Sequence, residues 1–66
     1  MTRFERENWI VNIENAASFI SSEVGEEAVE STLYRFGAGS IDDITDTDLS
    51  EVFSELYAVA VDLRSG

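Results

Sequence analysis

The sequence contains no cysteine, histidine, lysine or proline. Without cysteine the chain forms no disulfide, and without cysteine and histidine it lacks the usual ligands of a structural zinc site. The missing side chains are also the most common nucleophiles, Schiff-base amines and general bases. The remaining carboxylates fall on solvent-facing positions of a domain too small for a deep pocket. We therefore expect a protein that is not an enzyme and has no catalytic residues, no cofactor and no metal.

Long apolar runs are also missing, and none approaches the length of a membrane span. Residues 1–5 lack the basic and then apolar order of a signal peptide. We expect a cytoplasmic protein that does not interact with a membrane.

Positive charge is scarce. Fourteen acidic residues face four basic ones, all arginine, which gives a formal net charge of −10. Such a surface repels nucleic acids and anionic lipids and attracts basic proteins. One interpretation is solubility, for which a net charge of magnitude about 2–8 usually suffices. The other is that the charge binds a basic partner.

The 66 residues are enough for one domain, residues 1–66, with a small core. An apolar fraction of 44% argues against disorder. Helical periodicity runs between a few turn signals. We predict an all-α three-helix bundle with helices at about residues 3–23, 26–36 and 46–63, and a short helical turn near residues 40–44.

The first helix has apolar residues at steps of four, three, four and four. Thr2 and Glu5 have the spacing of a capping box at its start. Its predicted core face consists of Trp9, Ile13, Ala16, Ile20 and Val24. Gly25 either breaks this helix or lies within one continuous helix that includes the second, and both alternatives stay open. Gly37 follows the second helix, where a left-handed C-terminal cap is expected.

Two further signals for the start of a helix follow in the sequence. Ser40 and Asp43 have capping-box spacing at the short turn, and Thr45 or Thr47 is the predicted N-cap of the third helix. A heptad-like seam along the third helix is formed by Leu49, Phe53, Leu56, Ala60 and Leu63.

The third helix carries more apolar side chains than one seam needs. Tyr57, Val59 and Val61 lie beside the seam. They are either scattered exposed residues, which are common, or a face for a homodimer or another partner. A small domain gains stability from association, which favours the second interpretation.

Ten acids extend from the end of the first helix into the third: Glu23, Glu26, Glu27, Glu30, Asp42, Asp43, Asp46, Asp48, Glu51 and Glu55. Acids at helix starts are favoured by the helix dipole, so several of these residues need no functional explanation. Solvated faces normally mix both signs of charge, however, and here Arg35 is the only base among the ten. The ten acids are therefore the candidate partner-binding surface.

Residues 23–55, together with the acidic and apolar segment at residues 48–57, resemble the short acidic helical proteins of bacteriophages and other mobile elements. In size and charge the chain is similar to DNA-mimicking inhibitors of the anti-CRISPR and antirestriction type. The resemblance implies a non-catalytic inhibitor that occupies a nucleic-acid-binding surface of a basic partner protein and does not itself bind nucleic acid. The alternative is a structural or regulatory helical interaction module, or a homodimer, that uses the apolar face of the third helix.

Overall fold

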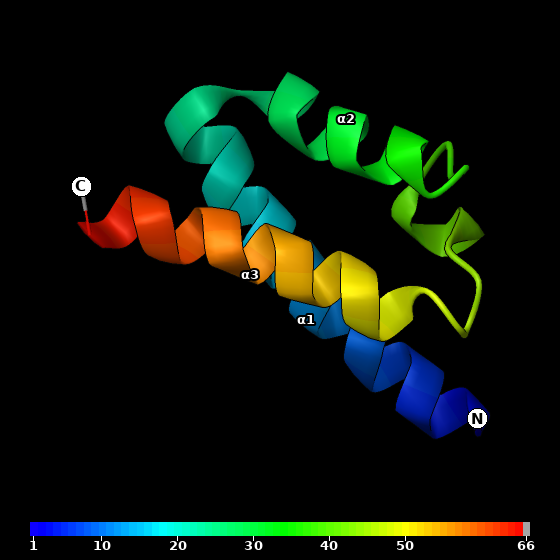
Figure 1. Ribbon diagram of the computed structural model, residues 1–66. Coiled ribbons are helices and arrows are strands. Elements are labelled where there is room, and N and C mark those ends of the chain that lie inside the picture. The colour runs from blue at the N-terminus through cyan, green and yellow to red at the C-terminus, as the bar shows by residue number, and fades with distance from the viewer. Residues whose placement is uncertain (66) are drawn as a thin grey trace.

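The computed structural model describes residues 1–65 and has three α-helices, α1 (Arg3–Val24), α2 (Glu26–Arg35) and α3 (Leu49–Ser65) (Figure 1). A single 3-10 turn, η1 (Ile41–Asp43), lies between α2 and α3, and no strand occurs within residues 1–65. The predicted all-α three-helix bundle is confirmed. None of the helices in this part of the chain combines the length and the hydropathy needed to cross a membrane.

The start of α1 is a capping box. The Glu5 backbone N–H donates to Thr2 Oγ1 at 3.1 Å, and the Thr2 backbone N–H donates to Glu5 Oε1 at 3.1 Å. Both bonds satisfy backbone N–H groups that have no partner within a helix. The capping box predicted from the spacing of these two residues is confirmed.

Gly25 separates α1 from α2. Its backbone has φ 99° and ψ 161°, a combination that is strained for any residue with a Cβ. Its N–H donates to the Ser21 carbonyl at 3.0 Å and closes α1. The chain then reverses direction, so α1 and α2 are two helices and the question that the sequence left open is resolved.

The end of α2 is a Schellman motif. Gly37 has φ 74°, the Ala38 N–H donates to the Leu33 carbonyl at 3.0 Å, and the Gly37 N–H donates to the Tyr34 carbonyl at 3.0 Å. Ala38 and Leu33 are both buried, which is the apolar contact that accompanies this motif. The predicted cap at Gly37 is confirmed.

The turn near residues 40–44 is present, but the capping box predicted for it is wrong. The Ser40 side chain makes no capping hydrogen bond. Instead, the Asp43 N–H donates to the Ser40 carbonyl at 3.1 Å, and the Ile44 N–H donates to the Ile41 carbonyl at 3.2 Å. Backbone carbonyls satisfy the donors of a turn this short, so no side chain is needed.

The predicted cap of α3 at Thr45 or Thr47 is also wrong, because α3 begins at Leu49. The two threonine hydroxyls lie 3.2 Å apart and bond to each other. Asp48 directly precedes the helix, and its carbonyl accepts the Val52 N–H at 2.9 Å. The segment before α3 forms a separate turn, closed by the Asp48 N–H and the Thr45 carbonyl at 3.0 Å.

The core lies mainly between α1 and α3, and α2 packs on α1 from another side (Figure 1). It consists of Ile13, Ala17, Ile20, Val29, Leu33, Ala38, Ile44, Leu49, Val52, Leu56 and Ala60. Val24 was predicted to face this core, but it is 54% exposed. Arg64, near the end of α3, lies over the Phe19 ring. α1 continues for about one turn beyond this point, so α3 does not reach far enough to cover Val24.

Candidate functional site

The predicted partner-binding acids are on the surface. Glu23, Glu26, Glu27, Glu30, Asp42, Asp43, Asp46 and Glu51 are exposed, and Asp48 and Glu55 are half-buried. The structure does not bring all ten together in one patch. They form three groups, on α2, on one flank of α3, and around η1, while Glu23 lies apart at the end of α1.

The first group covers the solvent side of α2. Glu27 and Glu30 lie beside Tyr34, which is 81% exposed, on the outer surface of this helix. Glu26 and Glu30 also line a groove of about 410 Å³ between α1 and α2, together with Glu14. Glu14 belongs to this acidic surface, although it is not among the ten predicted acids. Glu14 lies outside residues 23–55 in the sequence, and only the packing of α1 against α2 brings it next to Glu26 and Glu30.

The second group follows one flank of α3. Glu51 and Glu55 lie about 40° apart around the helix axis, at 100° per residue, and Asp48 directly precedes the helix. Asp62, two turns further along, continues the same flank. Glu55 forms an ion pair with Arg35 of α2, so this flank lies next to α2.

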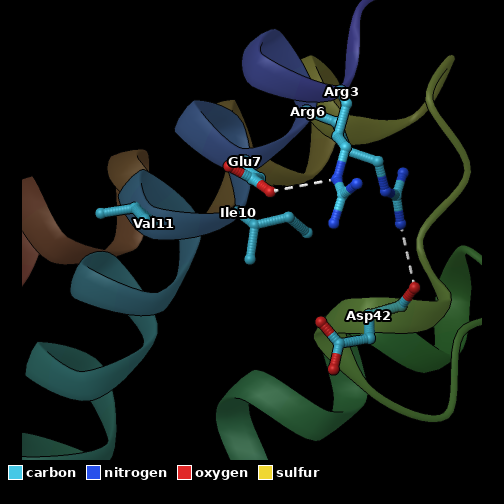
Figure 2. Close-up of a pocket in the computed structure, with 6 residues that line it drawn as sticks. All are labelled: Arg3, Arg6, Glu7, Ile10, Val11 and Asp42. Carbon is cyan, nitrogen blue, oxygen red and sulfur yellow. Dashed lines mark hydrogen bonds and ion pairs between the residues drawn. The ribbon is translucent and has the colours of Figure 1, made fainter.

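The third group surrounds η1 and is held by Arg6. Arg6 Nη1 lies 2.7 Å from Asp46 Oδ1, and Arg6 Nη2 donates to the Asp42 carbonyl oxygen at 2.9 Å. Figure 2 shows Arg6 and Asp42 on opposite sides of a groove of about 410 Å³ between α1 and η1. Ile10 lies in the same groove, and Arg3 at its edge pairs with Glu7 at 3.5 Å. Both arginines are therefore occupied by acids of the same chain.

These ion pairs reduce the charge that the predicted surface offers to a partner. Among residues 1–65, Arg6 and Arg35 pair with Asp46 and Glu55, two of the ten predicted acids. The other eight have no arginine within ion-pair distance in this part of the chain. The available negative charge is thus concentrated on α2, the turn at η1 and the first turn of α3.

The apolar residues singled out on α3 do not share one face. Tyr57 is 52% exposed, and Val61 lies about 40° from it around the helix. Val59 is exposed as well, but it lies on the opposite side of α3, next to the acidic flank. A partner that covers Tyr57 and Val61 therefore does not contact Val59.

The carboxylates are dispersed over the surface of the described residues. Within residues 1–65 no three of them converge closely enough to hold a metal ion. The pKa of the capping residue Glu5 is lowered, chiefly by the hydrogen bond from the Thr2 backbone N–H and further by the Thr2 hydroxyl. Glu5 lies in the first turn of α1 and is not one of the ten predicted acids. What the arrangement can do is attract and contact an extended cationic surface.

Comparison of the chain with protein-family models, with curated proteins and with solved structures gave no match.

Proposed function

We propose that this protein is a non-catalytic inhibitor whose acidic α2 side occupies a basic, nucleic-acid-binding surface of a partner protein in the cytoplasm. The observation that carries the proposal is the uneven distribution of charge. Acids surround α2, on its outer surface, in its groove with α1 and on the adjoining flank of α3. The groove on the other side of the α1–α3 pair is lined by no acid at all.

Solubility alone does not require this distribution. Charge that only solvates a protein works equally well on every side, and it works best with both signs interspersed. Here the like charges repel one another within one side of a small domain, which costs stability. A basic partner would offset that repulsion, because its lysines and arginines would lie between the carboxylates.

Tyr34 offers a neutral contact within the acidic surface. It projects from the outer face of α2 beside Glu27 and Glu30 and makes no aromatic contact within residues 1–65. Tyrosine is enriched among residues that dominate binding energy in protein interfaces. A partner site built for nucleic acid often combines arginine with aromatic side chains that stack on bases. In such a partner site, the Tyr34 ring would take the place of a nucleic-acid base, and the carboxylates beside it would take the place of phosphates.

The first test is capture of partners from a bacterial lysate on the tagged protein, followed by elution with duplex DNA or with salt. We expect a nucleic-acid-binding protein that DNA displaces and that about 0.5 M salt releases, because the Debye length is then only about 4 Å. The purified partner should bind DNA and this protein in competition. A captured protein that binds DNA and this chain simultaneously would contradict the proposal.

The position of the charge is tested separately from its amount. Glu30→Gln with Glu51→Gln removes two charges that no arginine neutralises, and we expect at least tenfold weaker binding, which is about 1.4 kcal/mol. A matched variant adds Phe4→Glu and Val11→Glu, two exposed sites on the outer face of α1, and so restores the net charge. If binding depends on the acidic side, this variant stays weak. Recovery of binding in the matched variant would show that only the total charge matters.

The resemblance to phage-encoded inhibitors suggests the class of partner. We propose a CRISPR nuclease or a restriction enzyme, since both carry basic channels for nucleic acid. Expression of the protein in a strain that carries either defence system should raise the survival of a targeted plasmid or phage. The Glu30→Gln and Glu51→Gln double variant is the control, and protection that it retains fully would argue against mimicry.

A further inference from the structure

One side of the α1–α3 pair is covered and the other is bare. α2 packs on one side through the buried residues Val29 and Leu33 and reaches α3 through the Arg35–Glu55 ion pair. On the opposite side no other element within residues 1–65 covers the seam between the two longest helices. We call this surface the seam face, and its principal residues are Asn12, Asn15, Phe53, Tyr57, Val61 and Arg64.

A row of aromatic rings lines the seam face. The Trp9 and Phe53 ring centres are 5.9 Å apart at an interplanar angle of 62°, and the Phe53 and Tyr57 centres are 5.6 Å apart at 29°. Trp9 and Phe53 are half-buried, and Tyr57 is exposed. Between this row and the asparagines of α1 lies a shallow groove of about 170 Å³. Aromatic residues with polar neighbours are typical of protein interfaces.

The seam face carries no acid along most of its length. On this flank of α1 the helical phase places acids only at the two ends, Glu5 and Glu23, whereas Glu7 and Glu14 lie on the opposite flank. The acids of α3 follow the flank next to α2, about 120–160° from Tyr57 around the helix axis. The one charged residue within the face is Arg64. Although the chain has 14 acids among 66 residues, the groove in the middle of this face is lined by none of them.

We propose that a second copy of this chain packs on the seam face. A copy with a net charge of −10 is repelled by every acidic part of the surface. When two seam faces meet, the acids around α2 point away from each other on the outer sides of the pair. The screening length in physiological salt is about 8 Å, so those acids then repel one another only weakly.

Under a twofold axis, Arg64 of each copy would offset the acids at the ends of the face, Glu23 at its own end and Glu5 of the other copy. Arg64 lies near one end, over Phe19, and Glu5 lies at the other end, in the first turn of α1. An axis that passes near Asn12 and Tyr57 would bring the Arg64 end of each copy to the Glu5 end of the other. Such a self-complementary contact is the commonest arrangement of homodimers. The two α1–α3 pairs would then pack face to face as four helices, with the aromatic rows between them.

The size of the face sets the expected strength of the dimer. α3 is about 25 Å long, and two neighbouring helices are about 20 Å wide, so the face measures on the order of 500 Å². Standard interfaces bury about 800 Å² per partner, and smaller ones are transient. We therefore expect a reversible dimer whose proportion increases with protein concentration.

The test is the molar mass in solution as a function of concentration, by sedimentation equilibrium. We expect the average mass to rise from the monomer toward twice 7.3 kDa. Tyr57→Glu should weaken association at least tenfold, because it places a charge in the desolvated contact. The matched control is Tyr34→Glu, the same change on the outer surface of α2, which should leave the dimer intact. A wild-type protein that is monomeric at all concentrations up to about 0.5 mM would overturn the proposal.

A second variant guards against an effect of Tyr57 on folding, since its ring packs on Phe53. Asn15→Glu adds a charge to the seam face at an exposed helical position, and glutamate is the better helix former. We expect it to abolish the dimer and leave the thermal transition of the monomer unchanged. A dimer that persists in both variants, or that is lost equally in Tyr34→Glu, would place the interface elsewhere. Salt distinguishes this contact from partner binding, because added salt should strengthen the dimer and weaken the partner complex.

Discussion

Gly25 is the residue on which the position of α2 depends, and replacing it tests how the acidic surface is built. At φ 99° and ψ 161° this residue lies in a region that only glycine occupies without strain. It is also the single residue between α1 and α2. Gly25→Asn would therefore either strain the backbone or move α2, and with it the acids at the start of that helix. Gly37→Asn is the matched control, since φ 74° at a Schellman motif is a left-handed conformation that asparagine tolerates.

The magnitude follows from the backbone alone, because no atom beyond the neighbouring residues lies within 4 Å of where a Cβ would be at either glycine. Strain of this kind costs about 1–3 kcal/mol. A domain of 66 residues has a free energy of unfolding of about 3–10 kcal/mol. For such a domain 1 kcal/mol corresponds to about 4–8 °C in Tm. We expect Gly25→Asn to lower Tm by about 5–20 °C and Gly37→Asn by less than half as much.

The assay is thermal unfolding followed by circular dichroism at 222 nm, with size-exclusion chromatography of both variants. The reasoning is refuted if the two substitutions cost the same, or if Gly37→Asn costs more. It is also refuted if Gly25→Asn keeps the wild-type Tm, since the corner between α1 and α2 would then not need glycine.

Three other predictions concern stability. Leu56 is 1% exposed, so Leu56→Ala should lower the free energy of unfolding by about 2–5 kcal/mol, and the same change at the half-buried Leu63 should lower it by less. Urea titration of both variants measures the two losses. Raising NaCl from about 20 mM to about 500 mM should raise Tm, because the salt shortens the Debye length from about 20 to about 4 Å and so screens the self-repulsion of the −10 charge. A fall in Tm would mean that salt weakens the exposed ion pairs more than it relieves this repulsion. Because the folded protein lowers the pKa of Glu5 below 4.5, the stabilisation by Glu5 is present at neutral pH and is lost as the pH falls through that lowered pKa. The Tm difference between wild type and Glu5→Gln should therefore be positive near pH 7 and shrink as the pH falls through the lowered pKa of Glu5, and a difference independent of pH would contradict this.

The sequence was sufficient to predict the helices and two of their caps, because periodicity and capping are local properties of the chain. The break at Gly25 stayed open, since glycine within a helix costs only about 1 kcal/mol and tertiary packing decides the outcome. The start of α3 was placed too early because Thr45 and Thr47 are good N-cap residues, yet their hydroxyls bond to each other in a separate turn.

The candidate surface was harder to predict, because it depends on which helices meet. The acids were correctly expected on the surface, but no local pattern indicated that Arg6 reaches Asp46, 40 residues away, or that Arg35 reaches Glu55. Glu14 joined the acidic side for the same reason. The seam face depends on the packing of two helices separated by 24 residues in sequence, and each helix alone shows only part of it.

Trp9, the only tryptophan of the chain, packs edge-on against Phe53 in the aromatic row of the seam face. Because the indole is half-buried there, its fluorescence serves as a built-in reporter of that one surface. Covering the face removes water from the ring and shifts its emission to shorter wavelength, whereas unfolding exposes the ring and shifts it to longer wavelength. A single unlabelled sample can therefore distinguish association from unfolding by the direction of one spectral change.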